Sequence, residues 1–86
     1  MDNAQRIEQM QHLLTESLQP TKLNIIDESH LHAGHAGAKE GKGHFRVQIT
    51  CERFTGLRLI QQHRLIYDSL GDMMQTDIHA LAIEIS

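Results

Sequence analysis

The sequence predicts a single small domain of the α+β class, in which helices cover one face of a three-stranded sheet. Apolar residues recur at helical spacing in some segments and alternate with polar residues in others. The predicted order is helix, strand, strand, helix, short helix, strand (α-β-β-α-α-β). A length of 86 residues with 40% hydrophobic residues suits one modest core, and no repeat or linker divides residues 1–86.

The first element is a helix that Asp2 or Asn3 can cap. Pro20 stops it, because proline cannot continue a helix. Apolar positions at spacings of three and four residues form its buried stripe, and they are Ile7, Met10, Leu13, Leu14 and Leu18. Residues 23–27 follow as a short strand rich in β-branched side chains.

The second strand is predicted over residues 44–52, where apolar and polar residues alternate. Its inward side chains are those of Phe45, Val47, Ile49 and Cys51. This register turns the Cys51 thiol toward the core, where a cysteine acts as a small apolar filler. We therefore expect Cys51 to be chemically inert.

Thr55 and Gly56 break the strand, and a helical period runs from residue 57 to residue 74. Projection of this segment gathers one apolar stripe made of Leu59, Ile60, His63, Ile66, Tyr67, Leu70, Met73 and Met74. His63 is therefore expected to be a packed core residue. Gly71 favours a break, with a longer helix up to Leu70 and a short one over residues 72–75.

The last strand is predicted over residues 78–85, with a bulky face and a face of mostly small or polar residues. The bulky face carries His79, Leu81, Ile83 and Ile85, and the other face carries Ile78, Ala80, Ala82 and Glu84. His79 is thus expected to open the strand on the bulky face.

A glycine-rich loop of about residues 29–44 joins the first two strands and carries four histidines. They are His30, His32, His35 and His44. Imidazoles ligate zinc, copper, nickel and iron, and His79 can add a distant ligand if the last strand begins near the end of the loop. The alternative is a solvated loop whose histidines bind nothing.

Composition excludes several classes of function. A net charge of −3 and a pI near 6.1 argue against a protein that binds mainly by neutralising phosphates. A single cysteine excludes an internal disulfide, and no signal peptide or apolar run of membrane-spanning length appears, so we expect a soluble cytoplasmic protein. No nucleophile elbow or phosphate-cradling loop is found, and no enzymatic activity is expected.

Five motifs, in order along nearly the whole chain, resemble the signature of the BolA family. They are Asp27-Glu28-Ser29-His30, Gly43-His44-Phe45-Arg46-Val47, Arg53-Phe54-Thr55-Gly56, Gln62-His63-Arg64-Leu65-Ile66-Tyr67 and Ile78-His79-Ala80-Leu81-Ala82-Ile83. The resemblance implies a fold similar to the class II KH domain. It also implies binding to a monothiol glutaredoxin, with which such proteins share a 2Fe-2S cluster in cluster trafficking or iron, redox and stress regulation.

In that shared site, the resemblance implies ligands from the glutaredoxin cysteine, from glutathione and from histidines of this chain, which alone would be apo. His79 matches the C-terminal histidine ligand of the family. His35 is the first choice for the second ligand, and His32, His30 and His44 are substitutes. His44 stands immediately before the strand, where it can equally serve to end the loop.

Relatives that resemble transcriptional regulators of stress and cell shape imply an alternative, which is DNA binding by the two late helices as a helix-turn-helix. Its basic face would consist of Arg46, Arg53, Arg58 and Arg64. The Gly-x-x-Gly clamp of KH domains is absent between helices, and its one match, residues 34–37, lies between strands. A homodimer is a further expected form of the protein.

Overall fold

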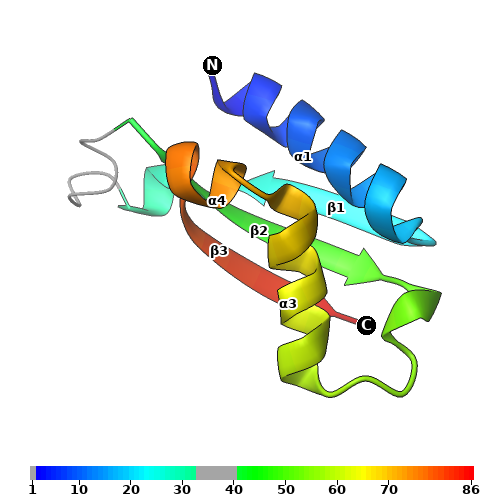
Figure 1. Cartoon of the computed structure of the whole chain (residues 1–86). Helices are drawn as coiled ribbons and strands as arrows, with labels where there is room; N and C mark the ends of the chain where they lie inside the picture. Colours follow the sequence, from blue (N-terminus) through cyan, green and yellow to red (C-terminus); the bar gives the residue numbers. More distant parts are fainter. Residues whose placement is uncertain (1, 33–40) are drawn as a thin grey trace.

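The computed structural model describes residues 2–32 and 41–86, and its helices lie over one face of a three-stranded sheet (Figure 1). The elements are α1 (Asn3–Leu18), β1 (Lys22–Asp27), the 3₁₀ helix η1 (Ser29–His32), β2 (Gly43–Thr50), the 3₁₀ helix η2 (Glu52–Phe54), α3 (Leu59–Leu70), α4 (Met73–Thr76) and β3 (Ile78–Ile85). The predicted order of helices and strands is confirmed, with the 3₁₀ turns as additions.

Helix α1 begins and ends as the sequence predicts. The Asp2 carboxylate accepts a hydrogen bond from the Gln5 backbone N–H at 2.8 Å, and the Gln5 side chain accepts one from the Asp2 N–H at 2.9 Å. At the other end, Gln19 turns into the left-handed region with φ of 51° and donates its N–H to the Thr15 carbonyl before Pro20.

Strand β2 is the central strand, antiparallel to β1 and parallel to β3. It begins one residue earlier than predicted, at Gly43, and ends at Thr50. The predicted alternation is confirmed, because Phe45, Val47 and Ile49 are all buried under the helices. His44, the first residue of the predicted strand, is the second residue of β2.

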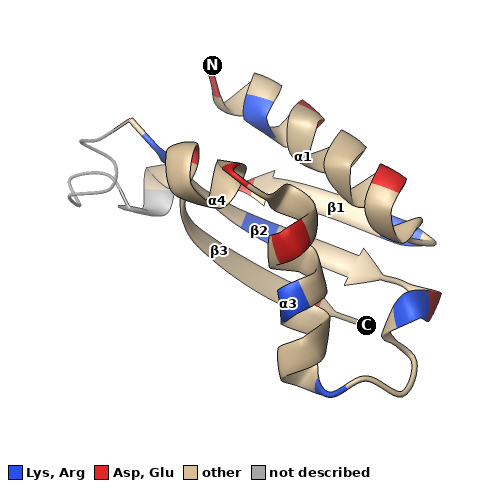
Figure 2. Cartoon of the chain, in the orientation of Figure 1, with Lys and Arg blue, Asp and Glu red and all other residues tan. Residues whose placement is uncertain are grey.

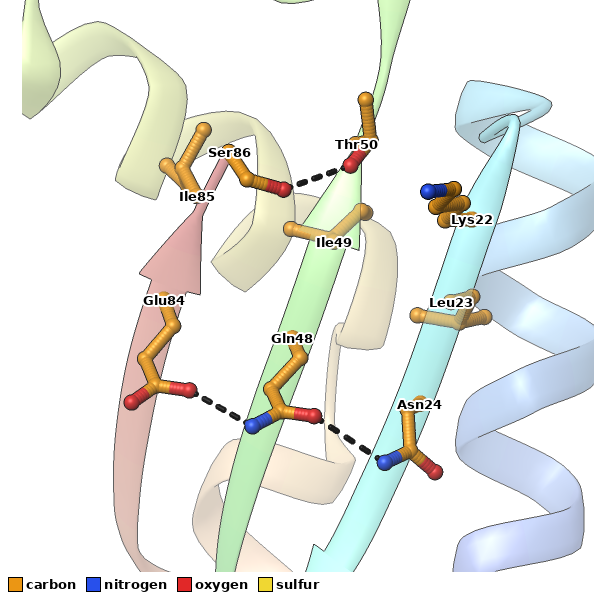
Figure 3. A pocket seen from close by; sticks show the side chains of 9 residues that line it. All are labelled: Lys22, Leu23, Asn24, Gln48, Ile49, Thr50, Glu84, Ile85 and Ser86. Carbon is orange, nitrogen blue, oxygen red and sulfur yellow. Dashed lines mark hydrogen bonds between the residues drawn. The ribbon is translucent and has the colours of Figure 1, made fainter.

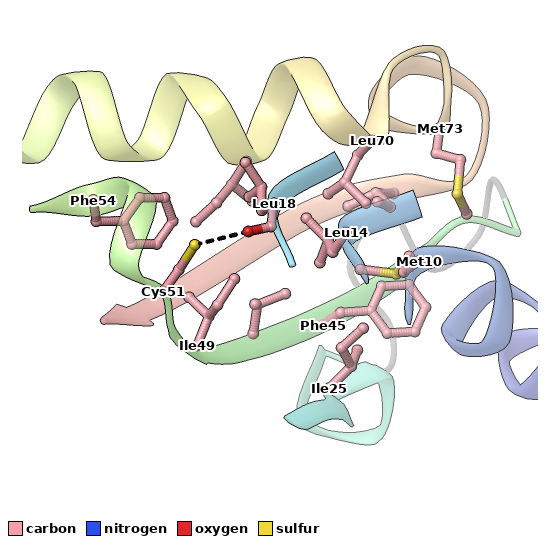
Figure 4. Packing of buried hydrophobic residues seen from close by; sticks show 13 residues of the cluster. Met10, Leu14, Leu18, Ile25, Phe45, Ile49, Cys51, Phe54, Leu70 and Met73 are labelled. Atoms are coloured by element: carbon pink, nitrogen blue, oxygen red, sulfur yellow. Dashed lines mark hydrogen bonds between the residues drawn. The ribbon is translucent and has the colours of Figure 1, made fainter. Parts of the chain in front are cut away.

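The core lies between the helices and the inner face of the sheet (Figure 4). Helix α1 contributes Met10, Leu14 and Leu18, which meet Phe45 and Ile49 of β2. Cys51 is buried at the edge of this core, and its thiol donates a hydrogen bond to the Leu18 carbonyl at 3.1 Å. The predicted inward direction of Cys51 is confirmed.

The predicted apolar stripe of the second helix is wrong in part. Ile66 and Leu70 are buried, but Leu59, Ile60 and Tyr67 are 63%, 66% and 39% exposed. The predicted break at Gly71 is confirmed, because α3 stops at Leu70, Gly71 has a φ of 57°, and the short helix α4 follows. Helical spacing groups apolar residues on one side of a helix but does not ensure that other elements cover all of them, and Leu59 and Ile60 in the first turn of α3 remain exposed.

His63 is consequently not a core residue. It is half-buried on α3, and its ring meets the edge of the Tyr67 ring with centroids 6.4 Å apart. Tyr67 lies one helical turn further along and is itself exposed. His63 belongs to the rim of the helix layer rather than to its interior.

The predicted faces of β3 are also wrong at its first residues. Gly43 pairs with Ile78 and His44 with Ala80, so β3 carries an extra residue, His79, at a bulge. Ile78 is therefore buried, whereas His79 is exposed. From Leu81 onward the expected alternation returns, and Leu81, Ile83 and Ile85 pack against the core.

No helix within residues 2–32 and 41–86 is both long and apolar enough to cross a membrane.

Candidate functional site

Two of the predicted ligands, His44 and His79, lie side by side where β2 and β3 begin. Their ring centroids are 5.0 Å apart and their planes are inclined by 52°. Two imidazoles bound to one tetrahedral metal at about 2.0–2.1 Å have ring centroids roughly 5 Å from each other. The separation of this pair therefore suits ligation of a single metal ion.

The two histidines differ in access. His44 is 4% exposed and is the one buried polar side chain among the described residues. His79 is exposed at the bulge of β3. A partner molecule can therefore reach His79 directly, with His44 behind it.

Backbone hydrogen bonds hold this end of the sheet in place. The His44 N–H donates to the Ser29 hydroxyl at 3.0 Å, and the His44 carbonyl accepts from the Glu28 N–H at 2.8 Å. The Gly43 N–H donates to the Asp77 carbonyl at 2.9 Å. The strand start that carries His44 is thus fixed from the β1 side and from the β3 side.

Of the other loop histidines, only His30 has a described side chain. His30 is exposed on η1, and His32 is the last residue of η1. His35, the first choice for the second ligand, lies outside the described residues. Within the part of the chain that the structure describes, no group of three or more His, Cys, Asp or Glu side chains could hold a metal ion.

The pairing of His44 with His79 could not be found from strand alternation. Alternation assigns His79 to the helix-covered face and His44 to the other face, and only the bulge brings both rings together. The sequence signals that do point to them are the histidine-rich loop with His79 as its distant ligand and the presence of both residues in two of the quoted family motifs.

Arg46 lies on the face of the sheet that the helices leave open. Its Nε donates to the Glu28 carboxylate at 2.8 Å, and its Nη1 donates to the Glu84 carboxylate at 3.2 Å. The hydrogen bond to Glu28 raises the pKa of Arg46 above its ordinary value. Arg46 is therefore separate from the other predicted arginines and already paired with two acidic groups.

Other polar side chains on the face of the sheet that the helices leave open also bond to one another (Figure 3). Gln48 donates to Glu84 at 2.8 Å and accepts from Asn24 at 3.0 Å, which links all three strands. A hollow of about 410 Å³ lies where β2 and β3 end, far from the histidine pair, and is lined by Lys22, Leu23, Asn24, Gln48, Ile49, Thr50, Glu84, Ile85 and Ser86. A smaller hollow of about 270 Å³ lies beside His44, where Ala80 and Ala82 leave room.

Arg53, Arg58 and Arg64 are exposed at η2, before α3 and on α3, in a part of the chain with several basic positions (Figure 2). The expected helix-turn-helix needs correction, because α4 is a single turn of four residues. Its sequence Met-Met-Gln-Thr has no basic side chain, and Met73 is buried. A recognition helix places several side chains on base edges in the major groove, and a single turn with Met73 buried offers few side chains for this.

Comparisons with known proteins agree on one family. A family model described as "BolA-like protein" matches residues 14–86 of this chain. The chain is 41% identical to Protein BOLA1, chloroplastic, of Arabidopsis thaliana over 81 residues, which are 91% of this chain and 51% of that protein. It is 38% identical to the DNA-binding transcriptional regulator BolA of Escherichia coli over 76 residues, which are 88% of this chain and 70% of the relative.

Solved structures give the same result. The BolA domain of SufE1 from Arabidopsis thaliana superposes with a TM-score of 0.82 at 36% identity, covering 94% of this chain and 90% of that domain. BolA1 from the same plant gives a TM-score of 0.77 at 39% identity, covering 92% and 87% of the two chains. This chain spans about half of the chloroplastic relative and 20% of SufE-like protein 1 of the same plant.

Proposed function

The chain belongs to the BolA-like family, and from that premise we propose that it binds a monothiol glutaredoxin and shares a 2Fe-2S cluster with it. In this proposal the chain supplies imidazole ligands, while the glutaredoxin cysteine and glutathione supply thiolates. The protein then acts as a non-enzymatic partner in cluster trafficking or in iron, redox and stress regulation.

The observation that supports this proposal most is the contact between His44 and His79. Imidazole suits iron, and two histidines on one iron are an established form of 2Fe-2S ligation. The centroid separation of 5.0 Å fits two imidazoles on one metal. A histidine pair would supply the ligands of one half of a shared site, in which the glutaredoxin cysteine and glutathione supply the other half.

Within this site we assign His79 as the ligand that meets the partner, because it is exposed at the end of the sheet. The second ligand is His44 or His35. His44 is favoured because its ring lies beside that of His79. His35 is favoured because it matches the family's ligand position in the loop. Substituting each histidine separately distinguishes them.

The test is to mix the chain with a monothiol glutaredoxin, glutathione, ferrous iron and sulfide under anaerobic conditions. We expect a visible absorption and circular dichroism spectrum that differs from that of the glutaredoxin with its own cluster. We also expect both proteins and iron to elute together in size-exclusion chromatography. An unchanged spectrum and separate elution would contradict the proposal.

DNA binding is the second candidate, and the exposure of Arg53, Arg58 and Arg64 favours it. In the absence of a recognition helix in α4, these side chains would contact phosphates rather than bases. Gel-shift titrations at several salt concentrations test this, because phosphate contacts make affinity fall steeply with salt. Arg64→Ala should then weaken binding and reduce the salt dependence, and a salt-independent affinity would contradict it.

A further inference from the structure

A network of polar side chains connects three separate segments at the end of the sheet that carries the histidine pair. Asn3, in the first turn of α1, donates through its amide to the Asp27 carboxylate at 3.2 Å and to the Ser29 hydroxyl at 3.0 Å. Arg6, one turn further along, donates to the side-chain amide oxygen of Asn3 at 2.9 Å and to the Asp77 carboxylate at 3.0 Å. We name these five residues the N-terminal clamp.

The clamp reaches the backbone on both sides of the bulge. Ser29 accepts the hydrogen bond of the His44 N–H, so the Asn3 branch fixes the strand start that carries His44. Asp77 directly precedes β3, and its carbonyl accepts the Gly43 N–H. The Arg6 branch therefore fixes the start of β3, two residues before His79.

Packing around the clamp is tight. The Arg6 and Asp77 side chains are only 12% and 15% exposed, so their ion pair is largely removed from water. A Cβ atom added at Gly43 would lie 2.9 Å from the Asn3 amide oxygen and would overlap the Phe45 ring. The clamp thus leaves little freedom for β2 to shift against β3 where the two histidines meet.

We propose that Asn3 and Arg6 are positioning residues for the His44–His79 pair: through Ser29 and Asp77 they set the distance between the two rings. This inference rests on the proposed function for its purpose, since a cluster ligand pair needs a fixed separation. The contact between the rings can nevertheless be measured without a cluster. A simple role of the clamp in folding would lower stability but leave the rings of the folded protein in contact.

The experiment uses the full chain without metal and measures the nuclear Overhauser effect between ring protons of His44 and His79, well below the melting temperature. We expect Asn3→Ala to lose this cross-peak while the core methyl shifts remain those of a folded protein. Arg6→Lys is the second variant, because it keeps the charge but cannot donate to Asn3 and Asp77 as a planar fork. We expect it to weaken the same cross-peak.

Ser69→Ala is the matched control. It removes the 2.9 Å hydrogen bond between Ser69 and Ser17, which also joins α1 to another element, but at the far end of α1. We expect the control to keep the His44–His79 cross-peak at full strength. An undiminished cross-peak in folded Asn3→Ala or Arg6→Lys would overturn the inference.

A second readout is the circular dichroism of the mixed complex with glutaredoxin, where Asn3→Ala should shift the visible bands and Ser69→Ala should not. The two proposals fail separately. If His79→Ala retained the wild-type cluster spectrum, the proposed function would be wrong, and the ring cross-peak in the metal-free chain would still test the clamp.

Discussion

The rings of His44 and His79 lie 5.0 Å apart on neighbouring parallel strands, at the register shift between Gly43 and His44. In a regular ladder each residue of β3 would have one partner on β2. The extra residue of the bulge lets Ile78 remain in the core while His79 turns toward His44. β-Bulges often redirect a side chain near a functional site, and this bulge does so for a candidate ligand.

His44→Ala tests whether the buried histidine is the second ligand. We expect it to lower cluster retention in the mixed complex, because it removes the imidazole beside His79. Loss of a buried polar side chain should also lower the free energy of unfolding by about 1–3 kcal/mol. Retention is therefore measured by visible circular dichroism at a temperature where the variant is folded.

The matched comparisons are His35→Ala and His12→Ala. His12 is exposed on α1, so its substitution should change neither stability nor retention. If His35→Ala abolished retention while His44→Ala left it intact, the second ligand would be His35, and the contact of His44 with His79 would be structural.

Gly43→Ala tests how tightly the bulge is packed. The added methyl group would overlap the buried Phe45 ring and approach the Asn3 amide, so the free energy of unfolding should fall by about 1–3 kcal/mol. Gly56→Ala is the control, because its Cβ would meet open space and only its φ of 81° is unfavourable. Urea denaturation compares the two, and a Gly43→Ala variant as stable as the wild type would contradict this packing.

The Asp27 carboxyl should make the free energy of unfolding depend on pH in the acid range. Burial raises the pKa of its carboxyl, but hydrogen bonds from the N–H and hydroxyl of Ser29 and from Asn3 outweigh burial and hold the pKa below 3.8. A carboxyl with a lowered pKa in the folded state stabilises the protein fully above pH 3.8, and this contribution is lost as the pH falls further through the folded pKa.

Asp27→Asn should therefore be less stable than the wild type near neutral pH and should lose less stability below pH 3.8. Urea denaturation at a series of pH values measures both differences. Parallel stability curves for the two proteins throughout the acid range would show that the Asp27 carboxylate contributes nothing.

Cys51 is predicted to take no part in cluster binding. Its thiol is buried and donates to the Leu18 carbonyl, so a thiol reagent such as Ellman's should react slowly with the native chain and rapidly after unfolding in urea. Cys51→Ala should leave the visible spectrum of the mixed complex unchanged. A loss of the spectrum in a folded Cys51→Ala variant would make this thiol a ligand.

The sequence predicts β2 and its buried face well. A central strand covered on one face follows a strict period of two, and Phe45, Val47 and Ile49 keep that period without interruption. The ends of α1 are equally predictable, because a capping aspartate and a following proline act on the neighbouring backbone alone.

The face of α3 and the start of β3 could not be predicted in the same way. Periodicity groups the apolar side chains of a helix on one side but does not say which of them other elements cover, and Leu59 and Ile60 lie in the predicted stripe of α3 yet are exposed. The bulge at His79 depends on the pairing of distant strands, which one sequence does not contain as a local pattern. The histidine-rich loop and the family motifs both point to the candidate ligands, whereas the contact between the His44 and His79 rings depends on the bulge.

The most direct test of the central claim is the His79→Ala variant in the mixed complex with a monothiol glutaredoxin, glutathione, iron and sulfide, with His12→Ala as control. We predict that His12→Ala gives the visible circular dichroism of the wild-type complex, whereas His79→Ala gives the spectrum of the glutaredoxin with its own cluster. A His79→Ala complex with the wild-type spectrum and iron content would contradict the claim that His79 donates a ligand to a shared cluster.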